Sequence, residues 1–414
     1  MYIKRDFYLN QIINRMNNGL VKIITGIRRC GKSYLLFNLF KQYLIDSGVD
    51  ENHIICIELD RRTFNKLTDP DELCKYVSDA ILDNNQYYLF IDEVQMCNDF
   101  ESVLNEFMHI KNLDVYVTGS NSKLISKDII TEFRGRGDEI HLNPLSFREF
   151  YSEYNDFDLA WNDYYTFGGM PLIISKKDDE SKMNYLKDLF KETYLKDIKE
   201  RNNIKNDVEL EELLNIISSS VGSLTNPKKL VDTFKSEKNI TISPNTVKDY
   251  LEYLEDAYLI RKSLRYDVKG KKYINTPSKY YFTDLGLRNA RLNFRQQEEN
   301  HIMENVIYNE LCIRGYSVDV GVVEINEKQD DGKYVRKQLE CDFIVNKGNN
   351  KCYIQSAYHL PSLDKENQEI RPLVNIQDSF KKIIIVRDNI KTKIDDNGII
   401  TMSLKEFLLN ENSL

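Results

Sequence analysis

Residues 26–33 read Gly-Ile-Arg-Arg-Cys-Gly-Lys-Ser and match the phosphate-binding pattern G-x-x-x-x-G-K-[ST]. The apolar run 21–25 stands directly before them and predicts a buried strand. Behind them, apolar side chains recur at helical spacing, at Leu35, Leu36, Leu39, Phe40, Tyr43 and Leu44. A strand, a glycine-rich turn and a helix are the context that a phosphate-binding loop requires. A chance glycine turn before a helix is the alternative. The strand pattern before these residues and the helix pattern after them favour the phosphate-binding loop.

The residue types of this loop suit a nucleotide. Its glycines permit backbone angles that a side chain would forbid, so N–H groups can surround phosphate oxygens at the positive end of the next helix. We expect Lys32 to reach the β- and γ-phosphates and the Ser33 hydroxyl to bind Mg²⁺. The predicted nucleotide-binding residues are Gly26, Ile27, Arg28, Arg29, Cys30, Gly31, Lys32, Ser33 and Tyr34.

A second signal is the apolar run 87–91, which ends in the adjacent acids Asp92 and Glu93. In parallel α/β sheets the carboxyl end of a buried strand enters the ligand site. We therefore expect Asp92 to hold Mg²⁺ through water and Glu93 to act as the general base on the attacking water. Two surface acids at a strand end are the alternative, which the preceding phosphate loop makes the weaker one.

Two further positions have open interpretations. The run 113–118 predicts another buried strand, after which Ser120 or Asn121 could sense the γ-phosphate; a turn that caps the next helix explains them equally well. Arg134 and Arg136 precede the short strand expected at 139–142. One of them could act as an arginine finger on a neighbouring subunit's nucleotide, and a solvated turn is the alternative.

The first third of the chain has the order of an α/β domain. Apolar runs at 21–25, 53–59, 87–91, 113–118 and 139–142 alternate with helical patterns. Five buried strands alternating with helices predict a doubly wound parallel sheet.

Four segments together carry a family resemblance: residues 26–33, Phe-Ile-Asp-Glu-Val-Gln at 90–95, Thr-Gly-Ser-Asn-Ser at 118–122 and Leu-Asn-Pro-Leu-Ser-Phe-Arg-Glu-Phe at 142–150. They resemble a widespread prokaryotic family of AAA+-type P-loop ATPases whose members carry a C-terminal domain of unknown function. The resemblance implies that Lys32, Ser33, Asp92 and Glu93 occupy the nucleotide, Mg²⁺ and base positions. It also implies a sensor role for Asn121 and a finger role for Arg136, with Arg134 as the alternative.

We expect four domains: a P-loop ATPase domain at 1–145, a helical lid at 146–205, a winged helix at 206–290 and a PD-(D/E)xK nuclease-like domain at 291–414. The Gly-Gly-Met-Pro run at 168–171 has a counterpart in the lid of the resembled family. The winged helix follows from three helical patterns, a hairpin of strands 260–264 and 272–274, and a strand at 279–284. Its third helix carries mostly acids, which oppose entry into a DNA groove, whereas the turn around Lys269-Gly270-Lys271 is basic. Contact between this turn and DNA phosphates stays an open alternative. We favour a winged helix that packs within the protein or contacts another protein.

The C-terminal pattern is a helix at 298–314 followed by strands at 318–325, 338–345 and 351–357. This order resembles the PD-(D/E)xK nuclease core, in which carboxylates hold Mg²⁺ and a lysine steadies the attacking water. Asp342 supplies the first acid, but Gln355 replaces the second and Ala357 stands where the lysine belongs. We therefore expect a nuclease-like scaffold that has lost cleavage and still binds nucleic acid or a protein; a purely structural role for Glu340 and Asp342 is the alternative.

Composition limits the function classes. The chain has 414 residues, 41% hydrophobic residues and a net charge of −8, which excludes a nucleic-acid binder that is basic throughout. No apolar run reaches the ~18 residues of a membrane span, and the first residues lack the apolar centre of a signal peptide, so we expect a cytoplasmic protein. Its cysteines are scattered without metal-ligand spacing. Cys30 is either a small tolerated residue or an oxidation-sensitive switch.

These observations predict an enzyme that hydrolyses Mg-ATP to drive a conformational switch or the remodelling of a partner. An ATP-gated DNA-processing or nuclease protein is the alternative, and a scaffold in which hydrolysis times partner release is a third. DNA and protein both remain open as partners. An arginine finger that acts on a neighbouring subunit would require a homo-oligomer, and a monomer in which these arginines have no such role fits equally well.

Overall fold

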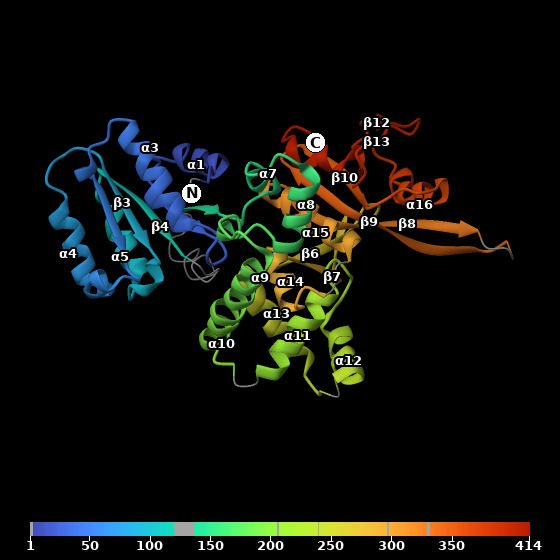
Figure 1. The fold of residues 1–414 in the computed structure, drawn as a ribbon, viewed down its shortest axis with the longest axis horizontal. Coiled ribbons are helices and arrows are strands. Elements are labelled where there is room, and N and C mark those ends of the chain that lie inside the picture. Colours follow the sequence, from blue (N-terminus) through green and yellow to red (C-terminus); the bar gives the residue numbers. More distant parts are fainter. Residues whose placement is uncertain (1–2, 120–135, 205–206, 239, 296–297, 329–331) are drawn as a thin grey trace. The chain divides into compact units, whose positions relative to one another are not determined.

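A computed structural model describes residues 3–119, 136–204, 207–238, 240–295, 298–328 and 332–414 (Figure 1). The chain divides into two compact units. Unit 1 comprises Met1–Pro144 with Asp256–Tyr258, and unit 2 comprises Leu145–Glu255 with Leu259–Leu414.

Unit 1 is built on a parallel five-stranded sheet with the order β2-β3-β4-β1-β5. Its strands are β1 (Val21–Thr25), β2 (Ile54–Glu58), β3 (Tyr87–Asp92), β4 (Leu113–Thr118) and β5 (Gly137–His141). The predicted doubly wound α/β class is confirmed. The expectation of five buried strands was wrong for β5, because this strand lies at the sheet edge and only Ile140 in it is buried.

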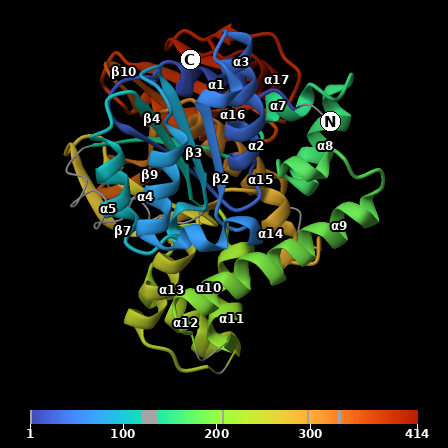
Figure 2. The same ribbon diagram turned by 90° about the vertical axis from the view of Figure 1, so that its left-hand side faces the viewer.

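Helices cover both faces of this sheet (Figure 2). On one face, α4 (Pro70–Ala80) and α5 (Phe100–Phe107) contribute Leu73, Val77, Val103, Leu104 and Phe107 to a core with strand residues. On the other face lie α1 (Asp6–Ile13) and the helix behind the loop, which runs through α2 (Lys32–Tyr34), η1 (Leu35–Phe40) and α3 (Lys41–Asp46). The Phe40 ring packs there against Phe90 and Tyr116, with centroids 5.5 and 4.8 Å apart. Short helices η2 (Glu51–His53), η3 (Arg62–Thr68) and η4 (Val94–Met96) join these elements.

Unit 2 begins with helices. The described elements are α7 (Phe147–Tyr151), α8 (Phe157–Phe167), η6 (Pro171–Ile173), the run of α9 (Asp179–Asp188), η7 (Leu189–Leu195) and α10 (Lys196–Arg201), then α11 (Asp207–Ser219), α12 (Pro227–Lys238), α13 (Pro244–Asp256) and α14 (Leu285–Arg291). The three helical patterns expected after residue 206 are thus present as α11, α12 and α13.

A mixed eight-stranded sheet forms the centre of unit 2, with the order β12-β13-β11-β10-β9-β8-β6-β7. Its strands are β6 (Ile260–Asp267), β7 (Lys272–Phe282), β8 (Ser317–Lys328), β9 (Tyr334–Lys347), β10 (Asn350–Ala357), β11 (Lys381–Val386), β12 (Lys393–Ile394) and β13 (Ile399–Ser403). From the sequence we predicted two separate strands where the structure has the single strand β7, and the predicted strands were shorter than β8 and β9. Residues 265–267 of β6 pair in parallel with residues 320–322 of β8, so the hairpin and the C-terminal strands share one sheet.

Two long helices pack on opposite faces of this sheet. On one face, Tyr308 of α15 (Glu299–Ile313) stacks on Tyr281 of β7, with ring centroids 4.1 Å apart. On the other, α16 (Leu363–Val374) places Leu373 in a core with Tyr353 and Ile384. α17 (Leu404–Leu409) ends the fold. No helix was expected at 363–374, where Pro372 lies inside α16.

The Gly-Gly-Met-Pro run has a packing role in unit 2. Gly168 has a φ of +73°, and a Cβ there would lie 2.4 Å from Asp284 Oδ1. The N–H of Gly169 donates to Asp284 Oδ2 at 2.7 Å, and the same carboxylate caps α14 through the N–H of Leu287 at 3.0 Å. These contacts hold the end of α8 against the start of α14. Within the described ranges, no helix is long and apolar enough to span a membrane.

Candidate nucleotide-binding site

The phosphate-binding loop begins where β1 ends. Gly26 has a φ of +139°, and a Cβ on it would lie 2.1 Å from the carbonyl oxygen of Leu142, so the site requires glycine. Gly31 also has a positive φ, of +101°, immediately before α2. The backbone therefore curls at both glycines of the motif, as the sequence predicted.

Lys32 lies inside this curl. Its side chain is buried, and its Nζ donates to the carbonyl oxygens of Gly26 at 3.0 Å and Ile27 at 3.3 Å. A buried ammonium group at the amino end of a helix provides a strong positive potential for phosphate.

Ser33 and Asp92 bring the loop and the end of β3 together. The Ser33 hydroxyl donates to Asp92 Oδ2 at 2.8 Å. Burial raises the pKa of Asp92 above its usual range, while hydrogen bonds from Thr118 and Ser33 act in the opposite direction. A hydroxyl and a buried carboxylate are oxygen ligands of the kind that Mg²⁺ prefers, so these two residues fit the ion.

Thr118, at the end of β4, is a part of the site that the sequence did not single out. Its hydroxyl donates to Asp92 Oδ1 and accepts from the backbone N–H of Glu93 at 3.1 Å. The signal that could have revealed it is a polar residue at the end of an otherwise largely apolar buried strand. Thr118 thereby fixes the carboxylate of Asp92 at the end of β3 and the backbone of Glu93, which follows it.

Glu93 has a left-handed backbone with a φ of +50°, which is uncommon outside glycine and is frequent at functional sites. Its carboxylate accepts a hydrogen bond from the side-chain amide of Gln95. The sequence did not predict this role for Gln95. Asp92 and Glu93 are adjacent and both contact Thr118, and Asp92 contacts Ser33, so the predicted acids lie beside the loop.

Arg136 is not brought to the loop of its own chain. It is exposed and directly precedes β5, and its carbonyl oxygen accepts from the N–H of Val21 at 3.1 Å. Val21 begins β1, whereas the loop follows the other end of that strand. Ser120, Asn121 and Arg134 lie outside the described residues, so their expected sensor and finger roles stay predictions.

Cys30 is fully buried in the loop. Its Sγ lies 3.4 Å from the carbonyl oxygen of Leu142, and burial raises the pKa of the thiol. Because the thiolate is the reactive form, this environment favours a packing role over an oxidation-sensitive one.

Comparison with known proteins agrees with this geometry. Residues 18–151 match the family described as an AAA domain, and residues 158–298 match a domain of unknown function, DUF8612. An uncharacterized protein of Haemophilus influenzae is 31% identical over 415 residues, which cover 98% of each chain. The chain belongs to this AAA-type P-loop ATPase family. An uncharacterized protein of Methanocaldococcus jannaschii is also 31% identical, over 98% of this chain and 89% of the other.

Among solved structures, the Walker-type ATPase of Pyrococcus abyssi is similar over 70% of this chain and 96% of that chain. The two are 14% identical, with a TM-score of 0.49.

In unit 2 of this AAA-type chain, two acids near the nuclease-like motif lie beside a buried lysine. Lys279 of β7 is 3% exposed, and its Nζ lies 2.8 Å from Glu304 Oε1 on α15 and 2.7 Å from Glu340 Oε1 on β9. The hydroxyl of Tyr281 donates to the same oxygen of Glu304 at 2.6 Å. The sequence did not predict this lysine, because it comes from a strand outside the motif.

The side chains at the positions of the nuclease-like motif make contacts within the protein. Asp342 is buried, and its Oδ2 accepts from the N–H of Ser356 at 2.7 Å; burial and then the charge of Glu304 raise its pKa. The Gln355 amide donates to Glu369 Oε2 at 3.0 Å, and Ala357 lies in the apolar core under α16. Among the residues that the structure describes, no group of three or more His, Cys, Asp or Glu side chains is arranged to hold a metal ion.

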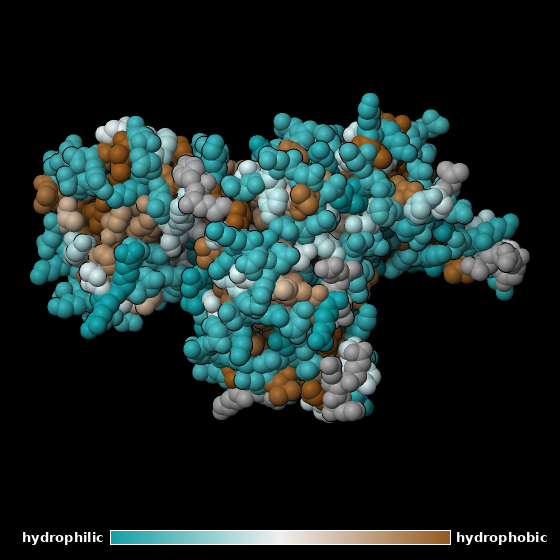
Figure 3. All heavy atoms as spheres, viewed as in Figure 1, coloured by the Kyte–Doolittle hydropathy of each residue, from teal (hydrophilic) through white to brown (hydrophobic). Residues whose placement is uncertain are grey.

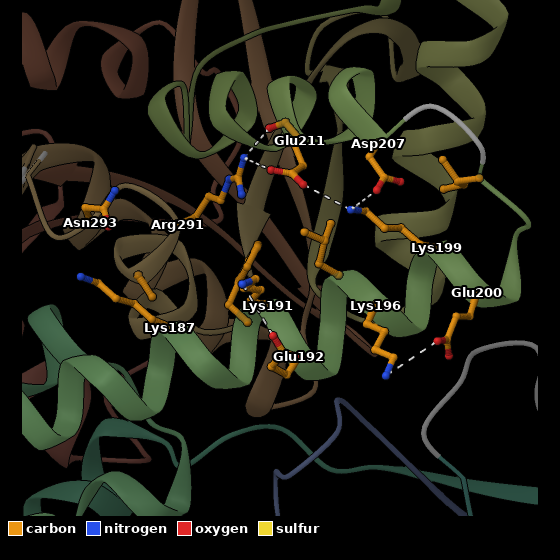
Figure 4. A pocket seen from close by; sticks show the side chains of 14 residues that line it. Lys187, Lys191, Glu192, Lys196, Lys199, Glu200, Asp207, Glu211, Arg291 and Asn293 are labelled. Atoms are coloured by element: carbon orange, nitrogen blue, oxygen red, sulfur yellow. Dashed lines mark hydrogen bonds and ion pairs between the residues drawn. The ribbon is translucent and has the colours of Figure 1, made fainter.

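A hollow of about 710 Å³ lies beside η7, α10, α11 and α14 of unit 2 (Figure 4). Lys199 lies 2.9 Å from Asp207 and 3.2 Å from Glu211, and Arg291 lies 3.5 Å from Glu211. Because these lining charges pair with one another, the hollow has no evident preference for an anion or a cation.

Proposed function

We propose that this AAA-type chain binds and hydrolyses Mg-ATP at Lys32, Ser33, Asp92 and Glu93. The observation that carries the proposal is the 2.8 Å hydrogen bond between Ser33 Oγ and Asp92 Oδ2, beside the buried Lys32. It supports the proposal because two residues that are far apart in the sequence lie side by side, next to the lysine. Family membership supports the same activity.

Each residue has a role in this mechanism. Lys32 would exchange its carbonyl partners for oxygens of the β- and γ-phosphates, and Ser33 and, through water, Asp92 would hold Mg²⁺. The ion, when bound, neutralises charge that develops on the phosphates. Glu93 accepts a proton from water as the water oxygen bonds to the γ-phosphorus and the bond to the β,γ-bridging oxygen breaks, which releases ADP and phosphate. Thr118 keeps both acids in position.

We further propose that hydrolysis drives a conformational switch that remodels a partner. Two features of unit 2 support a binding role. The helices α11–α13 and the hairpin β6–β7 fit a winged helix, and the order α15-β8-β9-β10 fits a nuclease-like scaffold. We propose that this scaffold no longer cleaves, because Gln355 is bonded to Glu369 and Lys279 supplies the positive charge among Glu304 and Glu340.

ATP binding and steady-state turnover of matched variants test the site. We expect Lys32→Ala to lose ATP binding and Glu93→Gln to bind ATP but to turn over at least about 100-fold more slowly. Glu106→Gln, at an exposed glutamate of α5, is the control and should match the wild type. Tight ATP binding by Lys32→Ala would refute the site, and unchanged turnover in Glu93→Gln would refute the base role.

A further inference from the structure

The outer part of the β8–β9 hairpin is a two-stranded ribbon. Among the described residues, β6 pairs with β8 only as far as Val322, and β10 pairs with β9 only from Phe343. The pairing of β8 with β9 continues beyond both neighbours, to Lys328 opposite Tyr334. Figure 1 shows this ribbon extending away from the rest of unit 2, so both of its edges lack a neighbouring strand.

The two faces of the ribbon differ. Side chains alternate between faces along a strand, and paired residues share a face. One face carries Ile325 and Leu339, which pack against the core that includes Leu373 of α16. The same face carries Glu327, which pairs with Arg371 of α16 at 2.5 Å. The opposite face carries the pairs Glu324–Gln338, Asn326–Arg336 and Lys328–Tyr334. Arg336 and Tyr334 on this open face are 71% and 69% exposed.

The hairpin β6–β7 continues the open face. The Arg265 guanidinium donates to the Gln338 side-chain oxygen on β9 at 3.1 Å. The adjoining turn carries the exposed residues Lys269, Lys271 and Lys272. Arg265, these lysines, Lys328 and Arg336 therefore lie on one connected part of unit 2.

Two of the described acids in this part, Asp267 and Glu324, are recessed, whereas Glu340 is 37% exposed and pairs with Lys279. Asp267 is buried and accepts from the backbone N–H groups of Lys269 at 3.1 Å and Gly270 at 2.8 Å, which fixes the turn. The Glu324 side chain is 17% exposed and is paired with Arg336. On a chain with a net charge of −8, this is a local basic and strongly hydrophilic surface; the ribbon is teal over most of the face seen in Figure 3.

We propose that this surface, defined as the open ribbon face with the β6–β7 turn, binds double-stranded DNA. The major groove of B-form DNA admits a two-stranded β-ribbon, and known β-ribbon proteins use it in this way. Arg336, Lys328 and Tyr334 face the groove, while Lys269, Lys271 and Lys272 contact phosphates of the flanking backbone. The deep and narrow major groove of A-form RNA excludes such a ribbon, so the proposal predicts DNA and not duplex RNA.

A matched pair of variants tests the ribbon face. Arg336 and Lys337 are adjacent on β9, and each pairs with a glutamate of β8, Arg336 with Glu324 and Lys337 with Glu327. They differ in the face on which they lie. With a fluorescently labelled DNA duplex of mixed sequence at low salt, we expect Arg336→Gln to weaken binding by about tenfold and Lys337→Gln by less than about twofold.

A second pair tests the turn. Log affinity falls as log salt rises, and the steepness of this fall reports the number of phosphates that the protein neutralises. In the variant Lys269→Ser/Lys271→Ser/Lys272→Ser the slope should become less steep by about 0.9 for each phosphate that is no longer neutralised. The control Lys177→Ser/Lys391→Ser/Lys405→Ser removes three other exposed lysines of unit 2 and should leave the slope unchanged. The midpoint of urea unfolding should stay at the wild-type value in all variants, which reports that they are folded.

Three results would overturn the proposal: no binding of duplex DNA by the wild-type protein at low salt, equal weakening by Arg336→Gln and Lys337→Gln, or equal affinity for duplex RNA. The test does not depend on ATP hydrolysis. Lys32→Ala should bind DNA as the wild type does, so failure of the proposed ATPase site and failure of this surface are distinguishable.

Discussion

The Thr118 hydroxyl donates a hydrogen bond to the Asp92 carboxylate across the neighbouring strands β4 and β3. The same hydroxyl accepts from the N–H of Glu93 at 3.1 Å. One side chain on β4 thus holds both acids of the proposed ATPase site. This contact explains why the site needs a polar residue at the end of a buried strand.

We expect Thr118→Val, which removes the hydroxyl and keeps the shape, to lower ATP turnover by about tenfold with a smaller effect on ATP binding. The reason is that Asp92 and Glu93 lose their common partner while Lys32 keeps its position. Thr118→Ser retains the hydroxyl and should stay close to the wild type in steady-state turnover. Unchanged turnover in Thr118→Val would contradict the role of this hydrogen bond.

The contact between Gly168 and Asp284 gives a stability prediction. A Cβ at Gly168 would lie 2.4 Å from Asp284 Oδ1, and the backbone has a φ of +73°. We expect Gly168→Ala to destabilise the protein by about 3 kcal/mol or more in urea unfolding, because steric overlap adds to backbone strain. Gly398 in the same unit has a φ of +74° and no atom near its Cβ position.

Gly398→Ala is therefore the matched control for strain alone, and it should cost only about 1 kcal/mol. If the two variants lost the same stability, the overlap with Asp284 would have no energetic weight.

Asp284 also makes stability depend on pH. Burial raises the pKa of this carboxyl to about 6 in the folded protein, above its ordinary value of 3.8. Between these two values the folded state binds more protons than the unfolded state, so this group adds stability as the pH falls. When the pH falls from about 7 to about 5, we expect the unfolding free energy of the wild type to rise by about 1.4 kcal/mol relative to that of Asp284→Asn.

Denaturant unfolding of both proteins at the two pH values measures this difference. Charges shared by the two proteins cancel in the comparison. Parallel pH profiles would show that Asp284 does not titrate in this range.

The contacts of Lys279 with Glu304 and Glu340 give a prediction about stability. We expect Lys279→Met to destabilise the protein by about 3–5 kcal/mol, because it leaves the buried Glu304 without its cation beside Glu340. The double variant Lys279→Met/Glu304→Gln should recover part of the loss, since it removes one of the two uncompensated charges. Lys262→Met, at an exposed lysine of β6, is the control and should change the unfolding free energy little. A stable Lys279→Met protein would contradict a structural role for this lysine.

Local pattern was sufficient to predict that the residues of the proposed nucleotide site lie close together. The glycines of the loop, Lys32, Ser33 and the acids ending β3 lie where their motifs and strand ends placed them. Thr118 and Gln95 could not be predicted in the same way, because their roles depend on contacts rather than on spacing. Lys279 shows the limit most clearly: it joins Glu304 and Glu340 from a strand outside the nuclease motif, and no spacing rule connects the three.

The elements of the fold were predicted best where hydrophobic periodicity was strong. The buried strands β1, β3 and β4 agree with the sequence, whereas the edge strand β5 carries little apolar signal. The ribbon of β8 and β9 was expected to be shorter because its outer residues are polar, and cross-strand hydrogen bonds sustain it rather than burial. The helix α16 was missed because Pro372 interrupts its pattern.

The parallel pairing of β6 with β8 bears on how this protein can be divided for experiments. A fragment that ends near residue 290 would keep β6 and β7 but lose β8, which would leave the hydrogen-bonding edge of β6 at residues 265–267 open to solvent. The complementary C-terminal fragment would expose the matching edge of β8. Unpaired strand edges promote aggregation, so we expect each fragment alone to aggregate. Co-expression of the two fragments is the more promising way to obtain a split protein.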